Sequence, residues 1–354
     1  MMLAACGTKT AETAVTNPMD TLLLKNYHPV NVNNIPQTFI EKAKFPVIDM
    51  HSHDYAANEE EIDQWVKNMD ECGIELTQVM HCSWIGEEFD KAVEKYSKYP
   101  DRFQIWCCFD YTEVLEGKGC DYAIAQLERA KAMGAVGVGE LGDKGDGDLY
   151  AAPVEGRGIH LDDPRIKPIL EKCGELKMPI NIHVAEPYWM YLPLNGSNDG
   201  LPNGADWAID TTKVDLGYWG LIKSFENAVR ENPQTIFIAC HYLNMNQDYK
   251  YLGELLDKYP NLYIDLAARV PEAAQIPRAT REFTLKYQDR ILFGTDNGMS
   301  KSMYRTIFRF LETEDEHFYS GFNYIWYLNG IYLPDSVLEK IYRTNALRIL
   351  NEYK

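Results

Sequence analysis

Residues 45–53 read FPVIDMHSH, a short apolar run that ends on two histidines separated by one serine. A run of this length and composition favours a buried strand of a parallel sheet. Side chains two positions apart on a strand point to the same side, so His51 and His53 can bind one ion together. A buried histidine is more often a hydrogen-bonded structural group, and the pair alone is therefore a weak signal.

Similar apolar runs return along the chain, separated by amphipathic segments that often end on Gly or Pro. This alternation predicts βαβ units with parallel strands, and eight of them fit a single-domain α/β fold, the (β/α)8 TIM barrel. A doubly wound sheet would need a glycine-rich phosphate loop after its first strand, and HSHDYAANEE (51–60) has none. The predicted strands cover residues 45–51, 74–82, 103–110, 135–141, 179–184, 235–241, 261–267 and 291–296.

Histidines and carboxylates stand where several of these strands end. In a barrel the C-terminal ends of the strands meet at one mouth, so these residues are expected in one site. Imidazole nitrogens and carboxylate oxygens are ligands that zinc and similar divalent ions accept. The combination predicts a metal centre. Its candidate ligands are His51 and His53 on strand one, Glu140 on strand four, His183 on strand five, His241 on strand six and Asp296 on strand eight.

Four segments in this order, VIDMHSH (47–53), INIHVAEP (180–187), FIACHY (237–242) and LFGTDNG (292–298), resemble the amidohydrolase superfamily. The C-terminal EKIYRTNALRIL (339–350) is similar to its amidohydrolase-2 branch. The resemblance spans about residues 45–350. It implies a hydrolase that uses a divalent metal ion to activate water.

The resemblance also assigns roles to individual residues. His51 and His53 match the family's strand-one ligands, and His183 matches its strand-five ligand. His241 matches the strand-six histidine, beside the carbonyl oxygen on which negative charge develops. Asp296 matches the aspartate that binds metal and carries the proton of the attacking water. Asp296 and His241 are thus the expected catalytic residues.

Glu140 has two interpretations. Its segment, VGVGELGD (136–143), also resembles the metal-binding glutamate segment of TatD-type deoxyribonucleases, and in some amidohydrolase branches a strand-four ligand bridges two metals. The mononuclear decarboxylase branches lack this ligand, and Glu140 would then be a salt-bridged acid at the strand end. We favour ligation, because burying an unpaired carboxylate is costly. We expect zinc, with manganese or iron as alternatives, and one or two ions per chain.

Other residues near the strand ends are candidates for contact with a small-molecule substrate. An arginine there can hold a substrate carboxylate through two hydrogen bonds, with a structural ion pair as the alternative. Glu186, three residues after His183, is an alternative acid or a partner of a ligand. The candidate substrate contacts are His81, Asp143, Lys144, Trp189 and Arg269.

The longest insertion, at about residues 186–220, follows the fifth predicted strand. Connections of this length are usually functional or disordered. Its aromatic residues, Tyr188, Trp189, Tyr191 and Trp207, favour an ordered loop over the barrel mouth, although they could equally pack among themselves.

The formal net charge of −18 argues against nucleic acid as a partner, because binding phosphates needs a basic surface. Most of the eight cysteines lie in apolar stretches and are expected to be buried rather than paired in disulfides. Composition does not decide whether the chain forms a homo-oligomer.

The N-terminal residues LAAC (3–6), followed by Gly7, resemble the lipobox of bacterial lipoproteins. Only five residues precede Cys6, too few for the basic and apolar parts of a signal peptide, so either the start lies upstream or the match is coincidental. We expect a tether at residues 1–20, the barrel at 21–354, and membrane contact only through a lipid anchor on Cys6. An exported, periplasmic or membrane-anchored protein is the first expectation, and a cytoplasmic one is the alternative.

These patterns predict a hydrolase of a C–N or C–O bond in an amide, lactone or ester. A metal-dependent decarboxylase of an aromatic or unsaturated acid is the first alternative. A lipid-anchored barrel that binds ligands without turning them over is an alternative of another class. The acidic charge disfavours a nuclease.

Overall fold

The structure, a computed structural model, describes residues 17–150, 158–203, 208–320 and 326–352. The chain divides into two compact units, residues 1–30 and 31–354. The described part of the first unit contains a short helix, α1 (Pro18–Thr21), and a 3-10 turn, η1 (Leu24–Asn26). Two residues singled out in the sequence, Cys6 and Trp207, lie outside the described residues. In the part that the structure describes, no helix is long and apolar enough to cross a membrane.

The described residues of the second unit contain eight strands, each overlapping one of the predicted runs, and β1 and β4 end one and two residues past theirs. Neighbouring strands pair in parallel and in chain order, first through third and fourth through eighth. The predicted α/β TIM-barrel fold is therefore confirmed. The strands are β1 (Val47–Ser52), β2 (Ile74–Val79), β3 (Phe103–Ile105), β4 (Val138–Asp143), β5 (Ile180–Val184), β6 (Phe237–Ala239), β7 (Leu262–Asp265) and β8 (Ile291–Leu292).

Backbone hydrogen bonds join the two groups of strands. Past the end of β3, the Cys107 amide donates to the Gly137 carbonyl at 3.0 Å, and the Gly139 amide donates back to Cys107 at 3.0 Å. At the other seam, the Met50 amide of β1 donates to the carbonyl of Phe293, next to β8, at 2.9 Å. These bonds link β3 to β4 and β8 to β1, as a closed ring of strands requires.

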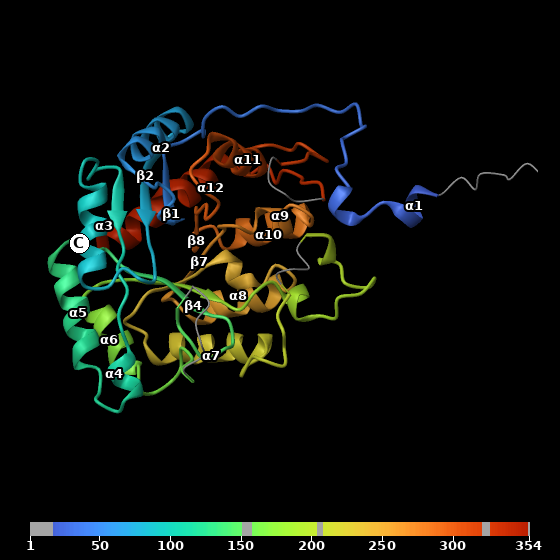
Figure 1. The fold of residues 1–354 in the computed structure, drawn as a ribbon. Coiled ribbons are helices and arrows are strands. Elements are labelled where there is room, and N and C mark those ends of the chain that lie inside the picture. Colours follow the sequence, from blue (N-terminus) through green and yellow to red (C-terminus); the bar gives the residue numbers. More distant parts are fainter. Residues whose placement is uncertain (1–16, 151–157, 204–207, 321–325, 353–354) are drawn as a thin grey trace, which may run out of the picture. The chain divides into compact units, whose positions relative to one another are not determined.

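Helices follow the strands along the chain, and Figure 1 shows those of the second unit arranged around the strands. The longer ones are α2 (Glu59–Cys72), α3 (Glu87–Tyr96), α5 (Asp121–Ala132), α6 (Lys167–Glu175), α7 (Tyr218–Glu231), α8 (Tyr249–Lys258), α10 (Pro277–Lys286), α11 (Lys301–Glu312) and α13 (Asn345–Glu352). Shorter elements are α4 (Thr112–Leu115), α9 (Val270–Ala273), α12 (Asp335–Glu339), the 3-10 turns η2 (Tyr188–Tyr191), η3 (Leu201–Asn203) and η5 (His241–Asn244), and the π-helical turn η6 (Lys340–Thr344).

Helix α2 shows why the sequence forms these elements. The Asn58 side chain caps its N-terminus by accepting from the amide of Glu61 at 3.0 Å, and Gly73 ends it in the left-handed conformation at φ 85°. Its apolar face is buried. There Trp65 is fully buried, and its indole Nε1 donates to the hydroxyl of Tyr304 on α11 at 2.9 Å. This packing holds α2 and α11 together.

Candidate metal centre

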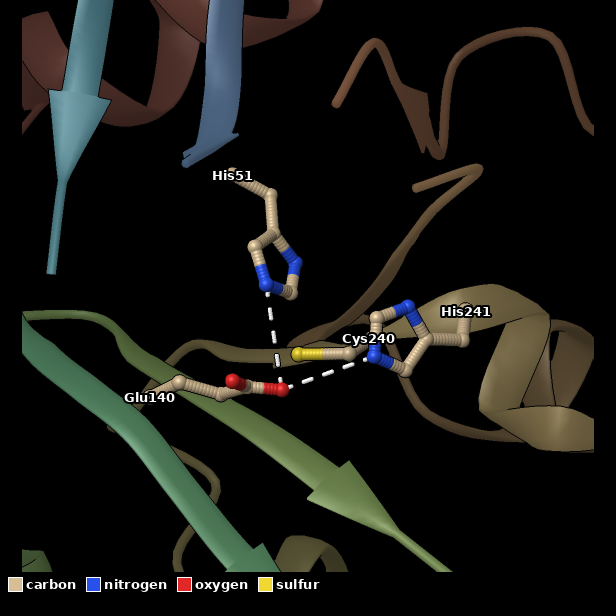
Figure 2. Close-up of side chains that lie close together, drawn as sticks. All are labelled: His51, Glu140, Cys240 and His241. Atoms are coloured by element: carbon tan, nitrogen blue, oxygen red, sulfur yellow. Dashed lines mark ion pairs between the residues drawn. The ribbon is translucent and has the colours of Figure 1, made fainter. Parts of the chain in front are cut away.

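The predicted ligands converge at the C-terminal ends of the strands. His51 and His53 lie at and just beyond the end of β1, and Glu140 lies within β4. His183 is on β5, His241 opens the turn η5 after β6, and Asp296 follows β8. Figure 2 shows the rings of His51 and His241 directed toward the same carboxylate oxygen of Glu140, His51 from above and His241 from the right.

One group of ligand atoms surrounds His53. Its Nε2 lies 3.0 Å from Asp296 Oδ1 and 3.1 Å from Glu140 Oε2. His51 Nε2 lies 3.7 Å from Glu140 Oε1 and 3.9 Å from Asp296 Oδ1. Ligands at about 2.0–2.1 Å from a tetrahedral zinc ion are about 3.4 Å from one another. The spacing of these atoms is thus close to that of a ligand set around one ion.

A second group shares Glu140 with the first. His183 Nδ1 lies 3.3 Å from Glu140 Oε1, and His241 Nε2 lies 3.5 Å from the same oxygen. The two histidine nitrogens are 3.1 Å apart. Glu140 thus stands between two sets of nitrogen ligands, as a carboxylate that bridges two ions would.

Two of these atoms are buried and lack a hydrogen-bond partner among the described residues, His51 Nε2 and Glu140 Oε1. Such atoms are rare in folded proteins, because each one costs about 1–3 kcal/mol of lost hydration. A divalent cation would satisfy both atoms at once. The donor set of imidazoles and carboxylates also suits zinc and its neighbours, so the residues fit a metal ion.

The electrostatics of the cluster also call for positive charge. Burial raises the pKa of Glu140 and of Asp296, but the surrounding histidines outweigh it and hold both pKa values well below the usual range. Burial lowers the pKa of His53, yet hydrogen bonds to the same two acids raise it to about 10. The two carboxylates therefore stay ionised and need a cation beside them, which a metal ion would supply in place of protons.

Partners behind the histidines fix which nitrogen faces the centre. Asp265 Oδ2 lies 2.9 Å from His51 Nδ1. His241 Nδ1 lies 2.8 Å from the carbonyl of Ala267, and His53 Nδ1 lies 3.0 Å from the carbonyl of Met80. Because these acceptors take a proton on Nδ1, the Nε2 lone pair of all three histidines is left for the centre.

The backbone leaves the strand conformation where functional residues begin. His241 has φ 63° and Asp296 has φ 49°, in the left-handed region that side chains other than glycine seldom adopt. Asp265 Oδ1 holds the first of these turns by accepting from the His241 amide at 2.8 Å. Strained residues of this kind are often found at functional sites.

Cys240 and Asp49 also lie at or beside the cluster, and neither is among the predicted site residues. The Cys240 sulfur lies with the ligand atoms of His51, Glu140 and His241, all within 4.8 Å of one another. Nothing in the sequence marks Cys240 except its place directly before His241. Asp49 accepts from the amides of His51 at 3.2 Å and Thr295 at 3.1 Å, and so ties β1 to the segment after β8. The alternation of β1 is the signal for Asp49, two residues before His51.

The five predicted substrate contacts fall into two sets, and Lys144 and Arg269 form the first around Glu186. Lys144 Nζ lies 2.6 Å from Glu186 Oε1, and Arg269 Nη2 lies 3.4 Å from Glu186 Oε2. Glu186 Oε2 is also 3.3 Å from His183 Nε2, so this charged group borders the metal cluster. Arg269 is buried and forms an ion pair with Glu186. Such a structural ion pair is the alternative that the sequence leaves open for this arginine.

The other predicted contacts lie apart from that group. Asp143 is buried, and its carboxylate lies 3.0 Å from His160 Nδ1, so it orders the loop after β4 rather than forming the solvated turn that its glycine-rich surroundings indicate. His81 Nδ1 lies 2.8 Å from the Ser83 hydroxyl. Trp189 lines a cavity at the side of the mouth. Whether any of them touches substrate stays a prediction.

Comparison with solved structures places the fold among known barrels. A TIM-barrel protein from Bordetella bronchiseptica matches with a TM-score of 0.55 at 17% identity, over 87% of this chain and 99% of that one. A probable 2-pyrone-4,6-dicarboxylic acid hydrolase from Acinetobacter baumannii matches with a TM-score of 0.53 at 14% identity, over 87% and 100%. IDCase from Metarhizium anisopliae matches with a TM-score of 0.55 at 14% identity, over 87% and 98%. No curated protein matches the chain by sequence.

The fold and the strand-end cluster define the class as a TIM-barrel protein with a candidate metal centre at its mouth. The family model described as Amidohydrolase matches residues 48–351, nearly the whole second unit. The chain therefore belongs to the amidohydrolase family, in the branch that the sequence motifs indicate.

Proposed function

We propose that this protein is a metal-dependent hydrolase that cleaves a C–N or C–O bond of a small molecule, such as an amide, lactone or ester. The observation that carries the proposal is the convergence of His51, His53, Glu140, His183, His241 and Asp296 at the barrel mouth, with His51 Nε2 and Glu140 Oε1 buried and lacking hydrogen bonds among the described residues.

These six residues would hold the metal, and zinc is the ion we propose first. Glu140 decides the number of ions, because it lies against both groups of histidines. A divalent ion bound there supplies Lewis acidity, which lowers the pKa of water to about 7 and polarises a substrate carbonyl.

Asp296 is the group that we expect to move the proton. Its side chain is 21% exposed, so it borders both the ligands and the open mouth. Its Oδ1 accepts from the Tyr55 hydroxyl at 3.2 Å, and its Oδ2 lies 3.6 Å from His241 Nε2. Burial raises the pKa of Asp296, but the neighbouring histidines lower it further, so the carboxylate is ionised at neutral pH. It can therefore accept a proton from water and pass it to the leaving group.

His241 serves as a ligand in this arrangement. Burial lowers the pKa of His241, and the charge of the neighbouring His183 lowers it further. The ring is therefore neutral. Its Nδ1 proton is directed at the Ala267 carbonyl, which leaves Nε2 as a lone pair facing Glu140 and Asp296. Its effect on the reacting carbonyl is thus to position the centre rather than to donate a proton.

The charged group of Lys144, Glu186 and Arg269 would orient the substrate. Two cations, Lys144 and Arg269, share the carboxylate of Glu186 there. The Lys144 side chain is 35% exposed and offers its ammonium to the mouth. A substrate with a carboxylate or another polar oxygen beside its scissile bond would fit this side of the centre.

A metal-dependent decarboxylase is the second candidate, because a decarboxylase, the isoorotate decarboxylase IDCase, is among the structural neighbours. The position of Glu140 disfavours it. A carboxylate that lies against both sets of histidines suits a centre that activates water, whereas decarboxylation needs no water as nucleophile.

The test is a screen of lactones, amides, esters and carboxylated aromatics with three preparations: the zinc-loaded protein, the chelator-treated protein and the zinc-loaded Asp296→Asn variant. We expect one substrate class to be hydrolysed by the first preparation and by neither of the others. Release of CO₂ from a carboxylated aromatic would establish the decarboxylase instead. Activity that survives chelation would refute metal dependence.

A further inference from the structure

A cavity of about 300 Å³ lies at the same end of the barrel as the metal centre. Most of its walls come from the segments after three neighbouring strands. Tyr188 and Trp189 belong to the insertion after β5, Asn244 to the turn η5 after β6, and Glu272 to α9 after β7. The volume is that of a small-molecule site for about one ring system.

The wall surfaces are mainly aromatic and aliphatic. Trp189 and Trp326 face the cavity with Tyr188, and Leu192 and Ile276 stand at its rim, where they are 37% and 41% exposed. Walls of this kind gain most by burying another flat apolar ring.

Most of the amide side chains that line the cavity are already engaged. The Asn244 amide donates to the carbonyls of Val184 and Ala185, at 3.1 Å each. Asn246 donates to a tyrosine hydroxyl at 3.0 Å, and Gln247 donates to another at 2.6 Å. These groups hold the walls in place and have few hydrogen bonds left for a ligand with many hydroxyls, such as a sugar.

Two side chains of the walls each carry one buried polar atom that lacks a hydrogen-bond partner among the described residues. These atoms are the carboxylate Oε2 of Glu272 and the indole Nε1 of Trp189. Burial raises the pKa of Glu272, and the nearby Arg269 opposes it. A buried polar atom without a partner calls for an explanation, and a ligand group that reaches it from the cavity is one.

We propose that this cavity binds a planar aromatic or heteroaromatic ring that carries one hydroxyl or N–H group, hydrogen-bonded to Glu272 and packed against Trp189. That the ring belongs to the substrate rests on the proposed hydrolase function. Glu186, whose Oε2 lies 3.3 Å from the metal-facing His183, immediately precedes the cavity wall at Pro187. The reacting bond of an aryl-substituted lactone or amide can thus lie at the metal centre while its ring occupies the cavity.

The first test measures binding alone, with metal-free protein and calorimetric titration. The probes are phenol, toluene, cyclohexanol and methyl glucoside. We expect phenol to bind at low-millimolar concentration and more tightly than any of the others. Leu192→Trp fills the rim and should lower the affinity for phenol at least tenfold. The matched Leu194→Trp, in the same insertion, should leave that affinity unchanged. Ile276→Trp repeats the test at another lining residue of the rim.

The second test isolates the hydrogen bond. Glu272→Met keeps the approximate volume of the side chain and removes its acceptor. Phenol affinity should fall about tenfold, as for the loss of a hydrogen bond to a charged group, while toluene affinity is not reduced. Circular dichroism and thermal unfolding check that each variant is folded.

Several results would overturn the inference: cyclohexanol or methyl glucoside binding at least as tightly as phenol, equal effects of Leu192→Trp and Leu194→Trp, or no change in phenol affinity in Glu272→Met. Because no metal or turnover is involved, the result is independent of the hydrolase proposal. A chain that binds phenol in this way but hydrolyses nothing would refute the proposed function and retain the ring site.

Discussion

Asp265→Asn should weaken metal binding although Asp265 is not itself a ligand. Asp265 is fully buried and uses its two oxygens differently. Oδ1 accepts from the backbone amides of His241 at 2.8 Å and Ala267 at 3.1 Å, whereas Oδ2 faces His51 Nδ1 at 2.9 Å. An asparagine has one acceptor oxygen, and two backbone donors will hold it at the Oδ1 position.

The asparagine NH₂ group then faces His51 Nδ1 and donates to it. His51 can accept this bond only if its proton moves from Nδ1 to Nε2, the atom that faces Glu140. A protonated Nε2 cannot bind a metal. Changes to such outer partners of metal ligands typically cost about 10–100-fold in metal affinity. We expect a loss in this range, because restoring the ligand tautomer would set two donors against each other in a buried site.

The assay is zinc competition against a chromophoric chelator at pH 7.5. The control is Asp315→Asn, which changes another buried aspartate, one hydrogen-bonded to Thr38 and Arg309 and outside the metal cluster. Asp265→Asn should lose affinity while Asp315→Asn keeps it. A folded Asp265→Asn protein with wild-type zinc affinity would refute the tautomer argument.

Glu140→Gln should lower the zinc content of metal-saturated protein and abolish hydrolysis, and full content with full activity would contradict a bridging role. Trp65→Ala should lower the free energy of unfolding by about 3–5 kcal/mol in urea denaturation, because it empties a fully buried site between α2 and α11; a loss below about 1 kcal/mol would contradict the packing. Burial raises the pKa of Glu226, but hydrogen bonds from Lys258, Lys223 and Tyr259 outweigh it and lower the pKa to about 2. Glu226 therefore stabilises the fold above its unfolded pKa of 4.5 and loses this effect as the pH falls toward 2. Glu226→Gln should lower the free energy of unfolding by about 1–2 kcal/mol at pH 7 and by clearly less at pH 3. An equal loss at both pH values would contradict this prediction.

The strand-by-strand organisation could be predicted because each strand is a compact apolar run followed by an amphipathic helix. The ends of the strands could not be placed as well. The predicted strands 235–241 and 291–296 run on to the functional residues, whereas β6 ends at Ala239 and β8 at Leu292. His241 and Asp296 adopt left-handed φ angles there, held by contacts from other strands that a local pattern does not contain.

The ligand cluster could be predicted for a related reason. The topology of a barrel brings strand ends together, so it is enough to know which residues stand there. The partners behind the ligands depend on side-chain directions that the sequence does not give. Neighbouring residues on a strand point to opposite sides, yet Cys240 and His241 both lie in the cluster. Asp143 likewise turns toward His160 across a loop. The cavity beside the centre depends on how the insertion after β5 folds, and its periodicity is too weak to predict that.

The central claim is that the residues at the barrel mouth bind a divalent metal. Its most direct test is equilibrium dialysis against zinc followed by elemental analysis, for the wild-type chain, the double variant His51→Gln/His53→Gln and the control His28→Gln, which changes an exposed histidine of the first unit. We predict one or two zinc ions per chain in the wild type and the control, and a loss of at least one in the double variant. A wild-type chain without zinc, or a double variant that keeps its full zinc content, would contradict the claim.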